Sequence, residues 1–235
     1  MFISLSDNMS LDRSKQKKNA GYRAAEYVED GMVLGLGTGS TAKYAIEKIG
    51  QRKKEENLEI VGIPTSLDTE KRAKKAGIDI VELDQADKID LTIDGADEVD
   101  PDMNLIKGGG GALLREKIIA HNSRHYVVIV DPSKMVDILG ESFDLPVEIL
   151  SLWQEGIRGQ VEKLGCEAQI RLEKGSLYET DNGNNILDCD FGEIKNPKEL
   201  SKRLNSIPGV IENGLFLDIS DKIIIGNEKG FEEKC

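Results

Sequence analysis

The chain of 235 residues carries 31 Lys and Arg against 43 Asp and Glu, which gives a formal net charge of −12. This acidic balance argues against a nucleic-acid binder, because such a protein needs a dense basic surface to neutralise phosphates. Hydrophobic residues make up 39% of the chain and charged residues of both signs 31%, a composition typical of a soluble globular protein and not of a disordered one.

The first stretch, Met1–Lys18, is dominated by polar and charged residues and lacks the apolar segment of a signal peptide. Nowhere in the chain do about 18 apolar residues follow one another, so we expect no membrane span. The cysteines Cys166, Cys189 and Cys235 form no CxxC pair, which fits a reducing compartment. The sequence therefore predicts a cytoplasmic protein.

Short apolar runs alternate with amphipathic stretches in the first half of the chain, a pattern typical of parallel βα units. Ser66 occupies an N-cap position and Gly77 the position of a C-terminal stop. The pattern predicts an α/β protein with an open, Rossmann-like, mostly parallel sheet. The expected strands are 32–36, 58–63, 78–83, 89–93 and 125–130, and the expected helices are 41–49, 67–76 and 111–122.

The second half shows a different order of elements. Its pattern reads strand, helix, strand, strand, helix, strand, which predicts a smaller ferredoxin-like α+β domain. The apolar run 222–226 is expected to return to the first sheet. We therefore expect a catalytic domain of residues 1–140 and 213–235, and a second domain of residues 141–212. The elements of the second half are expected at 145–150, 151–164, 166–172, 186–190, 197–204 and 210–217.

A glycine- and hydroxyl-rich segment, Gly35–Thr41, lies between the first expected strand and its helix. Glycines let the backbone approach a ligand, and the following helix N-terminus favours an anion. The hydroxyls of Thr38, Ser40 and Thr41 make a phosphate monoester a reasonable ligand. The dinucleotide and Walker patterns both fail here. A tight turn that needs glycine for steric reasons alone is the alternative interpretation.

Two acids follow the expected strand 89–93. In an open parallel sheet, ligands bind beyond the carboxyl ends of the strands, so Asp94 is expected to face that crevice. Asp97 lies across a glycine turn from it and is expected near the same space. The alternative is an Asx-type turn with solvated acids.

Lys107 is followed by four consecutive glycines, Gly108–Gly111. Such a run loses much conformational entropy on folding, so we interpret it as backbone that lies close to a ligand and not as a flexible linker. Glu116 lies in the second turn of the helix that follows. A base and a cation thus flank the loop, although a solvated Glu116 is the alternative.

Lys134 follows the end of the strand 125–130 and is interpreted as a further residue of the same rim, with a solvent-facing lysine as the alternative. His121 and His125 are four residues apart but lack the glutamate of the zinc-protease helix, and the helix is expected to end between them. We therefore expect no metal site, and the scarcity of histidine argues against a Ser-His-Asp or Cys-His enzyme.

Together these motifs resemble type A ribose-5-phosphate isomerase, in the family's order over roughly residues 20–226. Met1–Asp12 and Asn227–Cys235 have no clear counterpart, and the second domain matches mainly at its turns. The segments that carry the resemblance are Gly35–Ala42, Pro64–Ser66, Thr92–Val99, Lys107–Lys117, Ser133–Lys134, Leu145–Glu148, Thr180–Asn184 and Ile207–Val210.

The resemblance implies a homodimer or homotetramer that interconverts D-ribose 5-phosphate and D-ribulose 5-phosphate without metal or cofactor, in the non-oxidative pentose phosphate pathway. It implies Glu116 as proton acceptor, with Lys107, Asp94 and Asp97 as further catalytic residues. The substrate-binding residues that it implies are Thr38, Gly39, Ser40, Thr41, Asp94, Gly95, Ala96, Asp97, Lys107, Gly108, Gly109, Gly110 and Lys134.

The chemistry of this reaction fits the residues. Moving a carbonyl from C1 to C2 requires a base to remove a proton beside it, giving an enediolate whose negative oxygen needs fixed donors. A partly desolvated Glu116 at the pocket rim suits the first task, and Lys107 with the glycine-loop amides suits the second. Two other classes are considered: an acyl-CoA transferase with a nucleophilic glutamate, and a sugar-phosphate sensor, which would need a DNA-binding segment.

Overall fold

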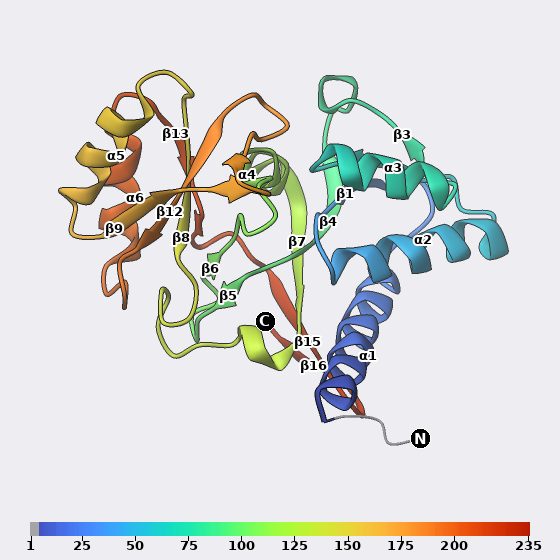
Figure 1. Ribbon diagram of the computed structural model, residues 1–235. Helices are drawn as coiled ribbons and strands as arrows, with labels where there is room; N and C mark the ends of the chain where they lie inside the picture. Colours follow the sequence, from blue (N-terminus) through green and yellow to red (C-terminus); the bar gives the residue numbers. More distant parts are fainter. Residues whose placement is uncertain (1–4) are drawn as a thin grey trace. The chain divides into compact units, whose positions relative to one another are not determined.

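The computed structural model describes residues 5–235, and the side chains from Asp12 onwards (Figure 1). Residues 1–4, the first part of the segment expected to have no family counterpart, lie outside the described residues. The chain forms two compact units. Unit 1 consists of the chain up to Gly95, Ile119–Lys134 and Ser220–Cys235, and unit 2 consists of Ala96–Ile118 and Met135–Ile219.

Unit 1 is built on a seven-stranded sheet with the strand order β16-β15-β7-β4-β1-β2-β3. Its neighbours pair in parallel except for β16, which runs antiparallel to β15. The predicted open, mostly parallel sheet is confirmed, and the run 222–226 returns to it as β15. The strands are β1 (Val33–Leu36), β2 (Val61–Pro64), β3 (Asp79–Ile80), β4 (Ile89–Gly95), β7 (Ser123–Val130), β15 (Lys222–Asn227) and β16 (Gly230–Lys234).

Helices α1 (Leu5–Ala25), α2 (Ala42–Glu56) and α3 (Leu67–Lys75) belong to the same unit. Ser66 caps α3 as predicted, since its hydroxyl accepts a 3.1 Å hydrogen bond from the Thr69 amide. Such a cap contributes about 1 kcal/mol. The buried core of the unit is formed by Ala, Val, Leu and Ile side chains from these helices and the central strands.

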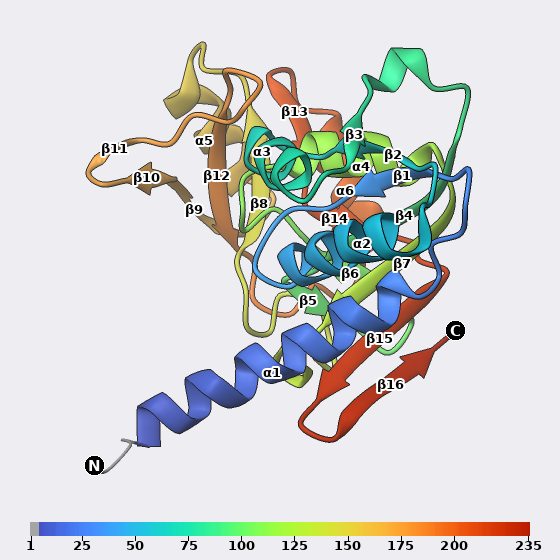
Figure 2. The same ribbon diagram turned by 90° about the vertical axis from the view of Figure 1, so that its right-hand side faces the viewer.

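The sequence pattern predicts neither α1 nor β16. Helix α1 packs through small residues, because a Cβ atom on Gly21 would lie 2.8 Å from the amide nitrogen of Ala45. On the other side, a Cβ atom on Gly226 would lie 1.9 Å from the carbonyl oxygen of Gln16. Figure 2 shows α1 running along the β15–β16 hairpin.

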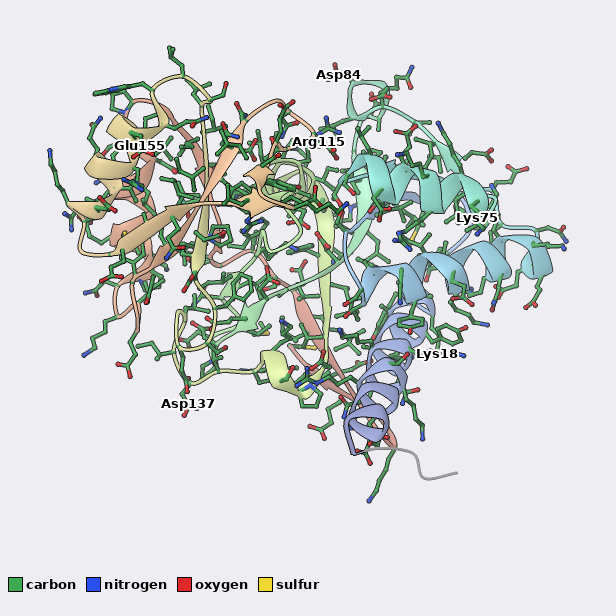
Figure 3. All side chains as sticks on the ribbon, in the orientation of Figure 1. Lys18, Lys75, Asp84, Arg115, Asp137 and Glu155 are labelled. Atoms are coloured by element: carbon green, nitrogen blue, oxygen red, sulfur yellow. The ribbon has the colours of Figure 1, made fainter. Side chains whose placement is uncertain are left out.

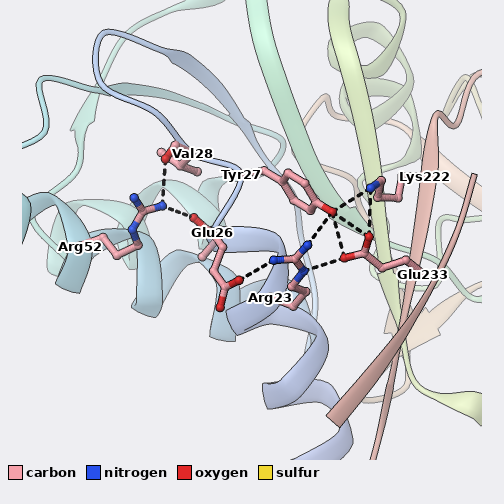
Figure 4. A network of polar contacts seen from close by, with 8 residues as sticks. Arg23, Glu26, Tyr27, Val28, Arg52, Lys222 and Glu233 are labelled. Atoms are coloured by element: carbon pink, nitrogen blue, oxygen red, sulfur yellow. Dashed lines mark hydrogen bonds and ion pairs between the residues drawn. The ribbon is translucent and has the colours of Figure 1, made fainter.

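A polar cluster fixes that hairpin to the end of α1 (Figure 4). Glu233 on β16 accepts hydrogen bonds from Arg23 Nε at 2.6 Å and from Lys222 Nζ at 3.0 Å. The Tyr27 hydroxyl donates to the same carboxylate at 2.8 Å and accepts from Lys222 Nζ at 2.7 Å. The last strand is therefore held by side chains as well as by its backbone ladder.

Unit 2 contains the predicted order of elements, with a four-stranded antiparallel sheet in the order β13-β8-β12-β9. This strand order and connectivity are those of a ferredoxin-like domain. Alternate residues of β8 face opposite sides, so Val147 packs into the apolar core while Pro146 and Glu148 share the other face. The elements are β8 (Leu145–Ile149), α5 (Gln154–Glu162), β9 (Glu167–Ile170), β12 (Asn185–Asp190), α6 (Pro197–Asn205) and β13 (Val210–Asn213).

The segment Ala96–Ile118 has its contacts in unit 2, whereas the sequence pattern placed it with residues 1–140 and 213–235. The cause is a small antiparallel sheet that the pattern does not reveal, in which β6 (Leu105–Ile106) pairs with β5 (Glu98–Val99) and β14 (Leu215–Phe216). Helix α4 (Leu113–His121) follows this sheet.

Charged side chains of both signs point outwards, among them Lys75, Asp84, Asp137 and Glu155 (Figure 3). In the part of the chain that the structure describes, no helix combines the length and the apolar character needed to cross a membrane.

Candidate active site

The glycine-rich turn between β1 and α2 has a steric cause at two positions. A Cβ atom on Gly35 would lie 1.9 Å from Thr92 Oγ1, and one on Gly37 would lie 2.1 Å from Asp94 Oδ1. Gly39 has no such neighbour within 4 Å, but its φ of +105° favours glycine. Gly35 and Gly37 are thus required for steric reasons, as the tight-turn interpretation has it. Gly39 lies exposed in the turn.

Asp94 holds this turn from inside unit 1. Its side chain is fully buried, and Oδ1 accepts hydrogen bonds from the amides of Thr38 at 3.0 Å and Gly95 at 2.7 Å. Strand β4 ends one residue after Asp94. The carboxylate therefore fixes the backbone of the predicted substrate loop.

The hydroxyl of Thr38 points into a cluster of hydroxyls and not outwards. Its Oγ1 atom lies 2.7 Å from Thr65 Oγ1, 2.8 Å from Ser66 Oγ and 3.1 Å from Thr69 Oγ1. These contacts tie the turn to the start of α3. The contacts of the Thr38 hydroxyl hold the loop in place. A contact between Thr38 and the substrate stays a prediction.

Ser40 and Thr41 lie at the start of α2. Thr41 makes no side-chain cap hydrogen bond, so its side chain does not occupy the positive end of the helix. Ser40 Oγ accepts a 2.8 Å hydrogen bond from Lys17 Nζ, which also lies 3.9 Å from Asp131 Oδ2. Lys134, at the end of the turn that begins after Asp131, belongs to the same unit. Sequence reasoning missed Lys17, because it stands in a polar stretch with no motif.

The second glycine loop follows β6 in unit 2. Gly108 and Gly111 have φ values of +105° and +75°, which favour glycine. The amide of Gly109 donates a 2.7 Å hydrogen bond to Asp97 Oδ2, and a Cβ atom on Gly109 would lie 2.7 Å from Asp97 Oδ1. The loop is therefore held by Asp97, and a close approach of its backbone to a ligand stays a prediction.

Lys107 and Glu116 form a buried ion pair across this loop. Lys107 Nζ lies 3.5 Å from Glu116 Oε2, and the two side chains are 3% and 5% exposed. The Lys107 amide donates to the Gly214 carbonyl at 2.9 Å, and its ammonium lies 5.4 Å from the centre of the Phe216 ring. The base and cation of the sequence analysis are thus brought together, and Glu116 is more deeply buried than a rim residue.

The neighbours of Glu116 on α4 fix its orientation. Arg115 Nε donates to Asn182 Oδ1 at 2.8 Å, and Lys117 Nζ donates to Glu212 Oε1 at 2.9 Å. Burial lowers the pKa of Lys117, although the ion pair with Glu212 acts in the opposite direction. Both contacts lie within unit 2 and hold the first turns of the helix in place.

The two histidines lie on different elements, as predicted. His121 is the last residue of α4 and His125 belongs to β7. Among the described residues, no group of three or more His, Cys, Asp or Glu side chains is arranged to hold a metal ion.

The predicted site residues thus fall into two sets, each ordered within its own unit. In unit 1 they are Thr38, Gly39, Ser40, Thr41, Asp94, Gly95 and Lys134, and in unit 2 they are Ala96, Asp97, Lys107, Gly108, Gly109, Gly110 and Glu116.

Comparison with known proteins gives consistent matches over most of the chain. The sequence model of a family described as ribose 5-phosphate isomerase A (phosphoriboisomerase A) matches residues 61–230. Ribose-5-phosphate isomerase A of Streptococcus gordonii is 47% identical over 216 residues, which cover 92% of this chain and 96% of that protein.

Solved structures agree with the sequence relatives. The structure of ribose 5-phosphate isomerase A from Methanocaldococcus jannaschii has 43% identity and a TM-score of 0.89, covering 93% of this chain and 97% of that one. A D-ribose-5-phosphate isomerase in complex with phospho-erythronic acid has 42% identity and a TM-score of 0.90, with the same coverage. The fold of this chain is therefore that of these isomerases.

Proposed function

The chain belongs to the ribose 5-phosphate isomerase A family, and from this premise we propose that Glu116 is the base of an aldose–ketose isomerisation. The substrate pair is D-ribose 5-phosphate and D-ribulose 5-phosphate. The carboxylate takes a proton from the carbon beside the carbonyl and returns it to the neighbouring carbon, through an enediolate.

The observation that carries this proposal is the buried pair of Glu116 and Lys107, 3.5 Å apart. A carboxylate held away from water beside a fixed cation is suited to a proton transfer that develops negative charge on a nearby oxygen. We assign the Lys107 ammonium and the Gly110 amide as donors for that oxygen, because donors that are already in place stabilise such a charge best. Gly110 is exposed, and its amide has no acceptor among the described residues.

The residues of unit 1 are assigned to binding the rest of the sugar phosphate. A cation, a hydroxyl and a helix N-terminus without a side-chain cap lie together at Lys17, Ser40 and Thr41, which suits a phosphate monoester. Asp94 and Asp97 each accept a hydrogen bond from a loop amide, and we assign both residues to sugar hydroxyls or ring opening, as the resemblance implies. Gly95, Ala96 and Lys134 complete the set as binding residues.

The test is Glu116→Gln, which keeps the shape of the side chain and removes the base. Turnover of ribose 5-phosphate by chelator-treated enzyme is expected to fall at least about 1,000-fold, because a general base typically contributes about 100- to 10,000-fold to the rate. Calorimetric binding of phospho-erythronic acid should change only a few-fold. Glu167→Gln, on the exposed face of β9, is the matched control and should keep wild-type turnover. Near wild-type turnover of Glu116→Gln would refute the assignment of the base.

Assembly and location remain predictions. We propose a homodimer or homotetramer, as the resemblance implies, with the neighbouring exposed side chains of Leu152 and Trp153, at 79% and 68%, as candidate contacts between copies. Light scattering of the purified chain measures the number of copies. We propose a cytoplasmic location, because Cys166, Cys189 and Cys235 are free cysteines, which fits a reducing compartment.

A further inference from the structure

The carbonyl groups of the second glycine loop receive donors from two side chains outside the predicted site. Arg171 Nη1 donates to the Gly108 carbonyl at 2.9 Å and to the Gly109 carbonyl at 3.2 Å. The Tyr178 hydroxyl lies 3.4 Å from the Gly110 carbonyl, at the long end of hydrogen-bond range. Three consecutive loop carbonyls are therefore contacted from one side, and all these residues belong to unit 2.

A short hairpin brings these two donors together. Strands β10 (Leu172–Glu173) and β11 (Ser176–Leu177) pair across the two-residue turn Lys174–Gly175, in which both residues have positive φ. This is the geometry of a tight hairpin turn, and glycine favours it. Arg171 immediately precedes β10 and Tyr178 immediately follows β11, and the Tyr178 amide donates to the Arg171 carbonyl at 2.9 Å.

Asp188 on β12 fixes the guanidinium of Arg171. Arg171 Nε donates to Asp188 Oδ2 at 2.9 Å, and Nη2 donates to Asp188 Oδ1, which makes the pair bidentate. The two side chains are 14% and 28% exposed, so water competes only partly for these bonds. Because Nε and Nη2 are occupied by the carboxylate, Nη1 is left pointing at the loop.

We propose that Arg171, held by Asp188, is a positioning residue that orients the Gly110 amide of the glycine loop toward the developing enediolate oxygen. The inference rests on the proposed role of this loop in the isomerisation. In a planar trans peptide the carbonyl and the amide point in opposite directions. Holding the Gly108 carbonyl therefore directs the Gly109 amide at Asp97 Oδ2, where it lies at 2.7 Å. Holding the Gly109 carbonyl directs the exposed Gly110 amide away from Arg171.

The loop needs such a clamp because of its composition. Ordering a backbone residue costs conformational entropy, and glycine loses more freedom than other residues. A donor that moves stabilises a transition state less than a fixed one, since reorganisation then occurs during the reaction. The glycines allow close approach, and Arg171 removes the mobility that they bring.

The proposal is tested with Arg171→Lys, which keeps the charge but cannot hold Asp188 and two carbonyls at once. We expect kcat for ribose 5-phosphate to fall about 10- to 100-fold with KM changed less than threefold. We also expect the hydrogen-bonded loop amides of Lys107, Gly109 and Gly111 to exchange hydrogen at least tenfold faster. Asp188→Asn frees Arg171 without removing it and should give smaller changes in the same direction. Arg158→Lys is the matched control, since Arg158 forms exposed ion pairs on α5 and should leave all three quantities unchanged.

The outcomes separate this inference from the proposed function beneath it. Unchanged hydrogen exchange of the loop in Arg171→Lys would overturn the positioning role, whatever the rate. Faster exchange with an unchanged kcat would overturn the catalytic role of the loop amide. It would not affect the assignment of Glu116 as the base, which Glu116→Gln tests separately. A loss confined to KM would also contradict the proposal, because a positioning residue for the transition state acts on kcat.

Discussion

Removal of the charge of Lys107 tests the central ion pair most directly. At 3.5 Å and an effective dielectric constant of about 20, the attraction between Lys107 and Glu116 amounts to about 5 kcal/mol, which is offset largely by the cost of taking both charges out of water. The substitution Lys107→Met leaves the carboxylate buried without this cation. We therefore expect it to lower the free energy of unfolding by about 3–5 kcal/mol.

A double-mutant cycle isolates the pair. Glu116→Gln alone leaves a buried ammonium and should also destabilise, whereas the combination with Lys107→Met removes both charges and should recover most of the loss. Urea unfolding at pH 7 measures all four proteins. As a control, Lys198 and Asp218 lie only 2.6 Å apart but are 70% and 65% exposed, so Lys198→Met should cost less than about 0.5 kcal/mol.

The same variants carry a kinetic expectation. Under conditions in which Lys107→Met is folded, its kcat should fall by a larger factor than its affinity for phospho-erythronic acid. The reason is that the ammonium is assigned to the charge that develops in the transition state. If Lys107→Met costs less than about 1 kcal/mol, or if the double variant is less stable than both single variants, the reasoning from burial and proximity is wrong.

Two further predictions follow from unit 1. Lys17→Met should raise KM for ribose 5-phosphate at least tenfold, since Lys17 contacts Ser40 at the proposed phosphate site, and an unchanged KM relative to the exposed-site control Lys15→Met would contradict that site. Burial acts to raise the pKa of Glu233, but hydrogen bonds from Arg23, Lys222 and Tyr27 outweigh it and hold that pKa at about 2, below the ordinary 4.5. The contribution of the ionised Glu233 to the free energy of unfolding is therefore present above pH 4.5 and is lost as the pH falls toward 2. Glu233→Gln should cost about 1 kcal/mol at pH 7, because solvent screens a pair near the surface, and nothing near pH 2. A pH-independent difference in urea unfolding would contradict this.

The sequence predicts those elements whose residues carry their own signal. Buried runs such as 89–93 become strands, and Ser66 begins a helix because its hydroxyl caps it locally. Helix α1 has no such signal. Its close contacts use Gly21 and neighbouring alanines, so the helix lacks the broad apolar stripe from which a pattern is recognised.

The candidate site shows the same division. Glu116 and Lys107 are predictable because a long glycine run stands between them, and the structure brings them together. Lys17, Arg171 and Tyr178 are not predictable from local sequence, since each acts on a loop far away in the chain. Their roles depend on which strand or helix face a residue occupies, which tertiary packing decides.

The two acids of the Asp94–Asp97 segment gain a common explanation from their contacts. Asp94 accepts the amide of Thr38 in the first glycine loop, and Asp97 accepts the amide of Gly109 in the second. A carboxylate oxygen that accepts a backbone amide makes a stronger bond than a neutral acceptor, about 1.5–3 kcal/mol against 0.5–1.5. Glycine loops have the most freedom to lose, so they need the stronger acceptor. One short acidic segment thus orders both loops.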